Sequence, residues 1–190
     1  MTHPVNNPSE EEPGPESRAS IAQKEPGDHK AWMRLALSLA ERSPPKPSNY
    51  RVGAVLVDDE THEVLATGYT LELPGNTHAE QCCLLKLAEK HGVPEEKLKE
   101  VLPANMILYT TVEPCSKRLS GNLPCVERVL RLAGSLRTVY VGVFEPEKFV
   151  TNTGRKTLEA AGVAVIHVGG LEEEILSVAT AGHVRKAEKG

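Results

Sequence analysis

Four side chains in the sequence have the types and the spacing needed for metal-dependent hydrolysis. His78 and Glu80 are two positions apart, and Cys115 and Cys125 each follow a proline, with nine residues between the two cysteines. One imidazole and two thiolates are soft ligands that suit zinc, and three protein ligands leave a fourth position for water. The pattern predicts a catalytic zinc site with His78, Cys115 and Cys125 as ligands. Glu80 is predicted to transfer protons beside the metal without binding it.

Each of these residues also has a simpler interpretation. Thr77 to Glu80 spells T-x-x-E, a helix capping box in which Glu80 bonds the backbone of Thr77. Zinc knuckles usually place cysteines about two to four residues apart, so the longer spacing leaves a disulfide or a core position open. Four cysteines are no disulfide framework in a cytoplasmic protein, whose thiols stay reduced. Cys82 lies one helical turn from His78 and competes as a ligand, but Cys82 and Cys83 are in an apolar helix, which favours core packing for both.

The elements that must position these residues follow from hydrophobic periodicity. The runs 50–59 and 63–70 are β-rich and are joined by a polar turn, which predicts a hairpin. Helices and strands then alternate, which predicts a mainly parallel sheet covered on both faces. The fold class is therefore a three-layer α/β/α sandwich with a five-stranded mixed sheet, whose first two strands are antiparallel. The predicted helices are 30–43, 77–92, 125–134, 154–162 and 171–188, and the later strands are 105–112, 137–144 and 163–169.

This topology also explains how distant residues meet. Loops that follow parallel strands gather at one edge of the sheet, and Cys115 and Cys125 lie in or next to such a loop. His78 joins them if its helix begins at the same edge, which the order of hairpin and helix allows. Helix N-termini also favour the ionised form of nearby thiols.

The first 28 residues are expected to be separate from a folded domain of residues 29–190. They are rich in Pro, Glu and Ser without an apolar period, which is typical of disorder. Their net charge of −4 equals that of the whole chain, so residues 29–190 are neutral. A neutral domain in a chain with 4% aromatic residues lacks the basic and stacking surface of a nucleic-acid binder. No signal peptide or long apolar run is found, so we expect a cytoplasmic protein that binds neither nucleic acid nor membranes.

Three motifs carry a resemblance to a known family. The segments "RVGAVLV", "THAEQCCL" and "TTVEPC" together resemble the cytidine-deaminase-like superfamily, over about residues 30–170. Members that act on nucleosides, cytosine or tRNA adenosine mostly carry P-C-x-x-C, whereas this chain has "SKRLSGNLP" between its cysteines. The longer spacing resembles the riboflavin-pathway pyrimidine deaminases, and "RLSGN" resembles their fungal form.

The resemblance implies a reaction and a substrate. The reaction is hydrolysis of 2,5-diamino-6-(ribitylamino)pyrimidin-4-one 5′-phosphate to the 2,4-dione and ammonia, with zinc as cofactor. "SNYRVGAVLV" is similar to the family's N-P-R-V-G motif, which assigns Asn49 to the sugar-like chain of this small pyrimidine substrate. The loop between the cysteines has two cations and no acid. A phosphate needs an anion-binding group near the metal, so Arg118, and after it Lys117, are predicted to bind it.

Several points depart from the family or stay open. Tyr50 replaces the family's proline, Glu145 replaces its aspartate, and Lys117-Arg118 stand where bacterial members have two histidines. Bacterial members also carry a reductase domain, and here a separate reductase is implied. Members commonly form dimers, so a homodimer is expected. The alternatives are a cytosine, nucleotide or tRNA-adenosine deaminase, or a structural zinc protein in which Cys82 completes the ligand set.

Overall fold

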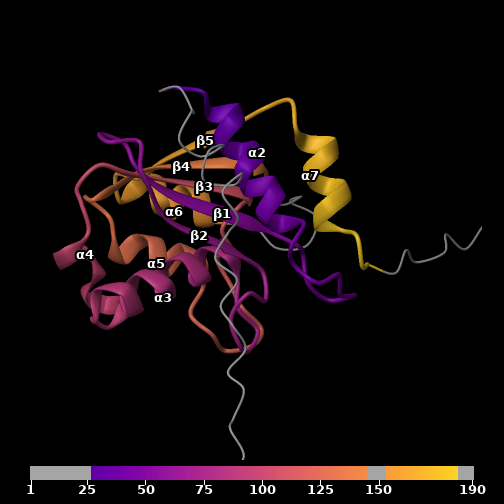
Figure 1. The fold of residues 1–190 in the computed structure, drawn as a ribbon, viewed down its shortest axis with the longest axis horizontal. Coiled ribbons are helices and arrows are strands. Elements are labelled where there is room, and N and C mark those ends of the chain that lie inside the picture. Colours follow the sequence, from indigo (N-terminus) through magenta and orange to yellow (C-terminus); the bar gives the residue numbers. More distant parts are fainter. Residues whose placement is uncertain (1–26, 145–152, 184–190) are drawn as a thin grey trace, which may run out of the picture.

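A computed structural model describes residues 27–144 and 153–183, whose strands form one mixed sheet between two layers of helices (Figure 1). This arrangement confirms the predicted α/β/α sandwich. The strands are β1 (Gly53–Asp58), β2 (Val64–Tyr69), β3 (Met106–Val112), β4 (Leu136–Val143) and β5 (Ala164–His167). The helices are α2 (His29–Ala40), α3 (Ala79–His91), η1 (Glu95–Lys97, a 3-10 helix), α4 (Leu98–Val101), α5 (Cys125–Arg131), α6 (Gly154–Ala160) and α7 (Glu172–Ala179).

The sheet has the order β2-β1-β3-β4-β5. β1 pairs antiparallel with β2, as predicted for the hairpin, and it also pairs antiparallel with β3, which the sequence did not specify. β3, β4 and β5 are parallel to one another. β3 is the central strand, and all seven of its residues are buried because helices cover both faces of the sheet.

Two hydrophobic clusters lie on the two faces of the sheet. Leu87 and the other apolar residues of α3 to α6 pack on one face, in the same cluster as Leu108 of β3. Trp32 of α2 and Ile175 of α7 pack on the other face, in the same cluster as Tyr109. Leu108 and Tyr109 point to opposite faces because side chains alternate along a strand. In Figure 1, α2 and α7 accordingly lie on one side of the sheet and α3 and α5 on the other.

A glycine in β2 allows α3 to lie directly on the sheet. A Cβ atom at Gly68 would be 2.2 Å from the carbonyl oxygen of Ala79 and 3.0 Å from the amide nitrogen of Cys83. Both atoms belong to the backbone of α3, so neither can move without moving the helix. The missing side chain at Gly68 therefore sets the height of the first turn of α3 above β2.

The observed elements differ from the predicted ones in three places. The helices η1 and α4 were not predicted, and α7 ends at Ala179, while residues 184–188 of the predicted helix lie outside the described residues. The predicted N-terminal tail also lies outside them, except for Gly27 and Asp28. Asp28 caps α2, because its Oδ1 accepts a hydrogen bond of 2.9 Å from the amide of Ala31. Each helix of the described residues is too short or too polar to cross a membrane.

Candidate metal centre and active site

The predicted ligand residues come together at one edge of the sheet. His78 is the N-cap of α3, Cys115 follows β3 through Glu113-Pro114, and Cys125 is the first residue of α5. Their three ligand atoms all lie within 4.8 Å of one another. Each sulfur is 3.5 Å from Nδ1 of His78. Among the described residues, this is the group of histidine, cysteine and acidic side chains that the geometry allows to share one ion.

The two cysteines are held together at the base of the loop between them. The amide of Val126 donates a hydrogen bond of 3.1 Å to the carbonyl of Cys115, and the amide of Cys125 donates one of 3.4 Å to the sulfur of Cys115. The nine residues between the cysteines thus leave and return at almost the same point. The unusual spacing of the cysteines in the sequence is therefore compatible with a short distance between their sulfur atoms.

The two thiols differ in their acidity. The pKa of Cys115 is lowered, first because Cys125 donates a hydrogen bond to its sulfur. The pKa of Cys125 is raised, first by this same bond to Cys115 and then by burial. The hydrogen bond between the two sulfur atoms therefore favours ionisation of Cys115 over Cys125, and a bound dication favours ionisation of both thiols.

Glu80 lies beside the three candidate ligands His78, Cys115 and Cys125, which we call the metal group, and not at the helix cap. Its side chain is buried, and its Oε2 lies 3.4 Å from the sulfur of Cys125. The hydroxyl of Thr110 lies 3.4 Å from Oε1. Burial is the largest cause that raises the pKa of this carboxyl group. The carboxyl group is thus directed at the metal group in an environment that favours its protonated form.

The capping box of the simpler interpretation forms between other residues than Thr77 and Glu80. The N-cap residue is His78 and not Thr77, and the amide of His78 donates to Oε1 of Gln81 at 3.4 Å. Thr77 instead donates its hydroxyl to the carbonyl of Leu73 at 3.0 Å. Gln81 therefore has the role that the simpler interpretation gave to Glu80, and Glu80 is left for the site.

Cys82 and Cys83 are both fully buried, as predicted. Cys83 belongs to the cluster beneath α3, and its thiol lies 3.6 Å from the carbonyl of Ala54. Burial raises the pKa of both thiols. Neither sulfur joins the metal group, so the described residues offer three protein ligands and not four.

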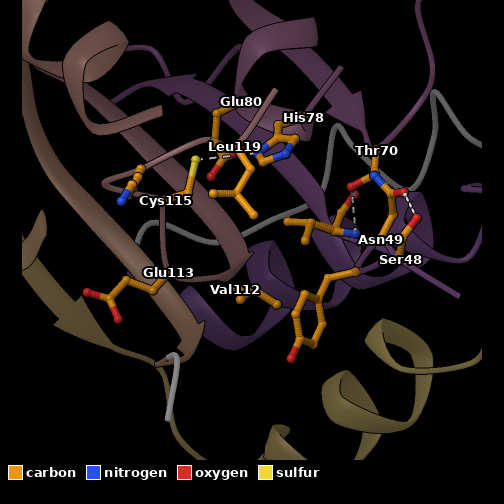
Figure 2. A pocket seen from close by; sticks show the side chains of 12 residues that line it. Ser48, Asn49, Thr70, His78, Glu80, Val112, Glu113, Cys115 and Leu119 are labelled. Carbon is orange, nitrogen blue, oxygen red and sulfur yellow. Dashed lines mark hydrogen bonds between the residues drawn. The ribbon is translucent and has the colours of Figure 1, made fainter. Parts of the chain in front are cut away.

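A cavity of about 330 Å³ opens over the metal group. It is lined by His78, Glu80 and Cys115 on one side and by Ser48 and Asn49 on the other, as Figure 2 shows. Leu119 also lines the cavity, and in the view of Figure 2 it is drawn over the side of the metal ligands. The cavity therefore places a bound molecule between the metal group and the Asn49 segment.

The predicted substrate residues are not equivalent in the structure. Asn49 and Lys117 line the cavity, whereas Arg118 is not among its lining residues. The guanidinium group of Arg118 instead bonds Gln81 and the backbone of Asn76. This geometry favours Lys117 over Arg118 as a group that reaches a molecule in the cavity.

Sequence reasoning did not single out three further residues of the cavity wall. Thr70 ends the hairpin, Glu113 precedes the Pro-Cys pair, and Leu119 lies at the tip of the loop between the cysteines, with 97% of its surface exposed. Leu119 and Leu123 are the two leucines of a mostly polar loop, and this pattern was the available signal for Leu119. Thr70 and Glu113 carry no comparable signal, because their approach to the cavity depends on how the strands pair.

The Asn49 segment is attached to the opposite layer of the fold. The amide of Arg51 donates to the carbonyl of Ala179 at 3.0 Å, and Nε2 of His183 lies 3.1 Å from the carbonyl of Asn49. The ring of Tyr50 packs edge-on against His183, with 4.8 Å between the ring centroids. The end of α7 and the residues after it therefore support one wall of the cavity.

Comparison with known proteins identifies the family. The family described as "Cytidine and deoxycytidylate deaminase zinc-binding region" matches residues 26–143. The chain belongs to this family. The match includes His78, Glu80, Cys115 and Cys125, and the zinc-binding character of the family confirms the predicted cofactor.

Individual relatives confirm the resemblance to riboflavin-pathway deaminases. The chain is 36% identical over 172 residues to the diaminohydroxyphosphoribosylamino-pyrimidine deaminase of Schizosaccharomyces pombe, which covers 90% of this chain and 40% of that protein. The chain thus spans about two fifths of the length of this curated relative. It is 49% identical to the Rib2 deaminase of Aspergillus oryzae solved in complex with DARIPP, with a TM-score of 0.75 over 82% of this chain and 91% of that one. A bifunctional deaminase and reductase of Thermotoga maritima is 27% identical, with a TM-score of 0.62 over 80% of this chain and 39% of that one.

Proposed function

We propose that this protein deaminates 2,5-diamino-6-(ribitylamino)pyrimidin-4-one 5′-phosphate by hydrolysis, giving the 2,4-dione and ammonia. The position of a buried carboxyl group beside a three-ligand metal group supports the reaction type. The substrate class is supported by the 49% identity to a Rib2 deaminase that was solved in complex with DARIPP.

The assignment of His78, Cys115 and Cys125 as zinc ligands is supported by their spacing. In tetrahedral coordination with ordinary bond lengths, a nitrogen and a sulfur ligand of zinc are separated by about 3.6 Å. Both sulfur-to-Nδ1 distances are 3.5 Å. The chain therefore presents a nearly preformed site, with a fourth position open toward the cavity. When bound there, zinc supplies a Lewis acid and lowers the pKa of a water molecule.

We assign the proton transfers to Glu80. Its carboxyl group accepts a proton from the attacking water and donates it to the ring nitrogen beside the carbon that carries the 2-amino group. It then takes the proton of the hydroxyl group added to that carbon and passes it to the amino group, which leaves as ammonia while the carbonyl forms. Such a group must be stable in both protonation states, and the raised pKa caused by burial brings the neutral state closer to working pH.

The cavity walls suggest how the rest of the substrate binds. Asn49 lies across the cavity from the metal group, so we assign it to the ribityl chain. Lys117 lines the cavity and offers a flexible cation, so we assign it to the phosphate. This assignment reverses the order expected from the sequence, in which Arg118 came first. The homodimer and the cytoplasmic location stay predictions.

Turnover of defined pyrimidines by the purified zinc-loaded protein tests this function. We expect ammonia release from the ribityl pyrimidine phosphate, slower release from its ribosyl counterpart, and none from cytosine or cytidine. Glu80→Gln should keep its zinc and lose at least about 10²-fold in kcat. Preferred turnover of cytosine or of a nucleotide would support the alternative deaminase. A zinc-loaded protein that releases no ammonia from any of these compounds would instead indicate a structural zinc site.

A further inference from the structure

The loop between the two cysteines is bonded to the segment that carries His78. Nη1 of Arg118 donates a hydrogen bond of 2.8 Å to Oε1 of Gln81, and Nη2 donates to the carbonyl of Asn76. The side-chain amide of Asn122, near the other end of the loop, donates to the same carbonyl at 3.4 Å. Two side chains of one loop thus meet one backbone acceptor, two residues before His78.

The two acceptors of Arg118 lie on either side of His78 in the chain. Oε1 of Gln81 also accepts a hydrogen bond of 3.4 Å from the amide of His78. The guanidinium group is therefore linked to the backbone just before the histidine and, through Gln81, to the histidine itself. Because Arg118 lies between Cys115 and Cys125, this one side chain connects the loop that joins two of the proposed ligands to the turn that carries the third.

The same contacts continue to the other wall of the cavity. Oδ1 of Asn76 accepts a hydrogen bond of 2.9 Å from the side-chain amide of Asn49. Oδ1 of Asn49 in turn accepts one of 2.9 Å from the hydroxyl of Ser48. Asn76 thus binds Arg118 through its backbone and Asn49 through its side chain, and a displacement of Asn76 alters both the metal side and the substrate side.

We propose that Arg118 is a positioning residue that fixes the cysteine loop to the His78 turn and, through Asn76, orients Asn49 toward the substrate. An arginine suits this role because its planar fork presents two donors in a fixed geometry, and the two acceptors here belong to different segments. The ammonium group of a lysine is a single point of contact and cannot bond both acceptors in the same way. The role in substrate orientation rests on the proposed function, whereas the role in holding the metal group does not.

Zinc release tests the proposal without any substrate. Zinc-loaded protein is mixed with an excess of a chromogenic chelator, and the rate of zinc transfer is recorded for Arg118→Ala, Arg118→Lys and Gln81→Ala. Residues that orient metal ligands typically change metal affinity about 10- to 100-fold. We therefore expect release about 10-fold faster or more from Arg118→Ala, and an intermediate rate from Arg118→Lys. Arg34→Ala is the control, because its guanidinium group makes an exposed ion pair with Glu174 on the opposite layer and should leave the rate unchanged.

The arginine–glutamine contact itself is tested by the double variant. If Arg118 acts through Gln81, adding Gln81→Ala to Arg118→Ala should accelerate release by less than the product of the two single effects. Wild-type release rates in both folded Arg118 variants would overturn the proposal. Circular dichroism identifies a variant that does not fold, in which case Arg118→Lys decides the outcome.

Kinetics separates positioning from phosphate binding. Arg118→Ala should raise KM for the phosphorylated and the dephosphorylated pyrimidine by the same factor, because Asn49 is displaced for both. Lys117→Ala should raise KM for the phosphorylated compound alone. A KM increase in Arg118→Ala that is confined to the phosphorylated compound, with wild-type zinc release, would overturn the proposal and make Arg118 a phosphate ligand. If the protein turns over neither pyrimidine, the proposed function fails, and the zinc-release measurements still decide the role of Arg118.

Discussion

Gly68→Ala should damage the active site from a position that contributes no functional group. The new Cβ would lie 2.2 Å from the carbonyl oxygen of Ala79, where ordinary contact begins at about 3.4 Å. Strand β2 and the first turn of α3 must therefore separate by about 1 Å, a displacement that can cost on the order of 10²-fold in rate when it moves catalytic groups. Since that turn carries His78 and Glu80, we expect a loss of this order in kcat/KM, together with about 1–3 kcal/mol of stability from overpacking.

The matched control is Gly142→Ala on β4. There the new Cβ would lie 2.4 Å from Cδ1 of Ile175 and 2.9 Å from the carbonyl of Thr111, on the face covered by α2 and α7. This variant should also lose stability, but it should retain zinc and kcat, and a change in KM is expected because Ile175 belongs to α7, which supports the Asn49 wall of the cavity. The assay combines urea unfolding, zinc content and steady-state kinetics for both variants. If Gly68→Ala keeps wild-type kcat/KM and zinc, the argument that this glycine sets the height of α3 is refuted.

Three further outcomes are expected. Cys125→Ala should lose zinc on purification and Cys82→Ala should retain it, as measured by metal analysis; the reverse result would exchange their roles. In metal-free protein, burial raises the pKa of Glu80 above its value in the unfolded chain. The protonated carboxyl group therefore contributes to stability at pH values below the unfolded pKa, and this contribution is lost as pH rises through the folded pKa. The melting temperature of Glu80→Gln relative to wild type should therefore increase from pH 5 to pH 8, and a constant difference would contradict this. Deleting residues 1–26 should leave melting temperature and turnover unchanged, because the first described helix is capped by Asp28; a large fall in either would show that the deleted segment supports the domain.

The clustering of His78, Cys115 and Cys125 could be predicted because it depends on residue types and on strand topology. Cys115 follows a buried strand, and Cys125 begins a helix that packs on the same sheet, so parallel topology brings them together whatever the length of the loop. His78 meets them because α3 starts at the same edge. The core positions of Cys82 and Cys83 followed from the apolar helix around them.

The contacts of individual polar side chains could not be predicted in this way. The sequence T-H-A-E-Q allows Thr77 to pair with Glu80 or His78 to pair with Gln81, and the choice depends on where the helix begins. Burial of Glu80 against Thr110 and Cys125 settles that choice through tertiary packing. Arg118 looked like a phosphate ligand because its charge is visible in the sequence, whereas its acceptors, one of them a backbone carbonyl of another segment, are not.

The Asn49 segment is attached to the end of α7, and this attachment offers a route by which the cavity can change. The metal group rests on one helical layer, and the opposite wall of the cavity is attached to the other layer through Ala179 and His183. Small shifts of α7 across the sheet therefore widen or narrow the space between metal and substrate wall without touching a ligand. Substitutions on α7 give evolution, or a library screen, a means of adjusting substrate preference while the hydrolytic chemistry is preserved.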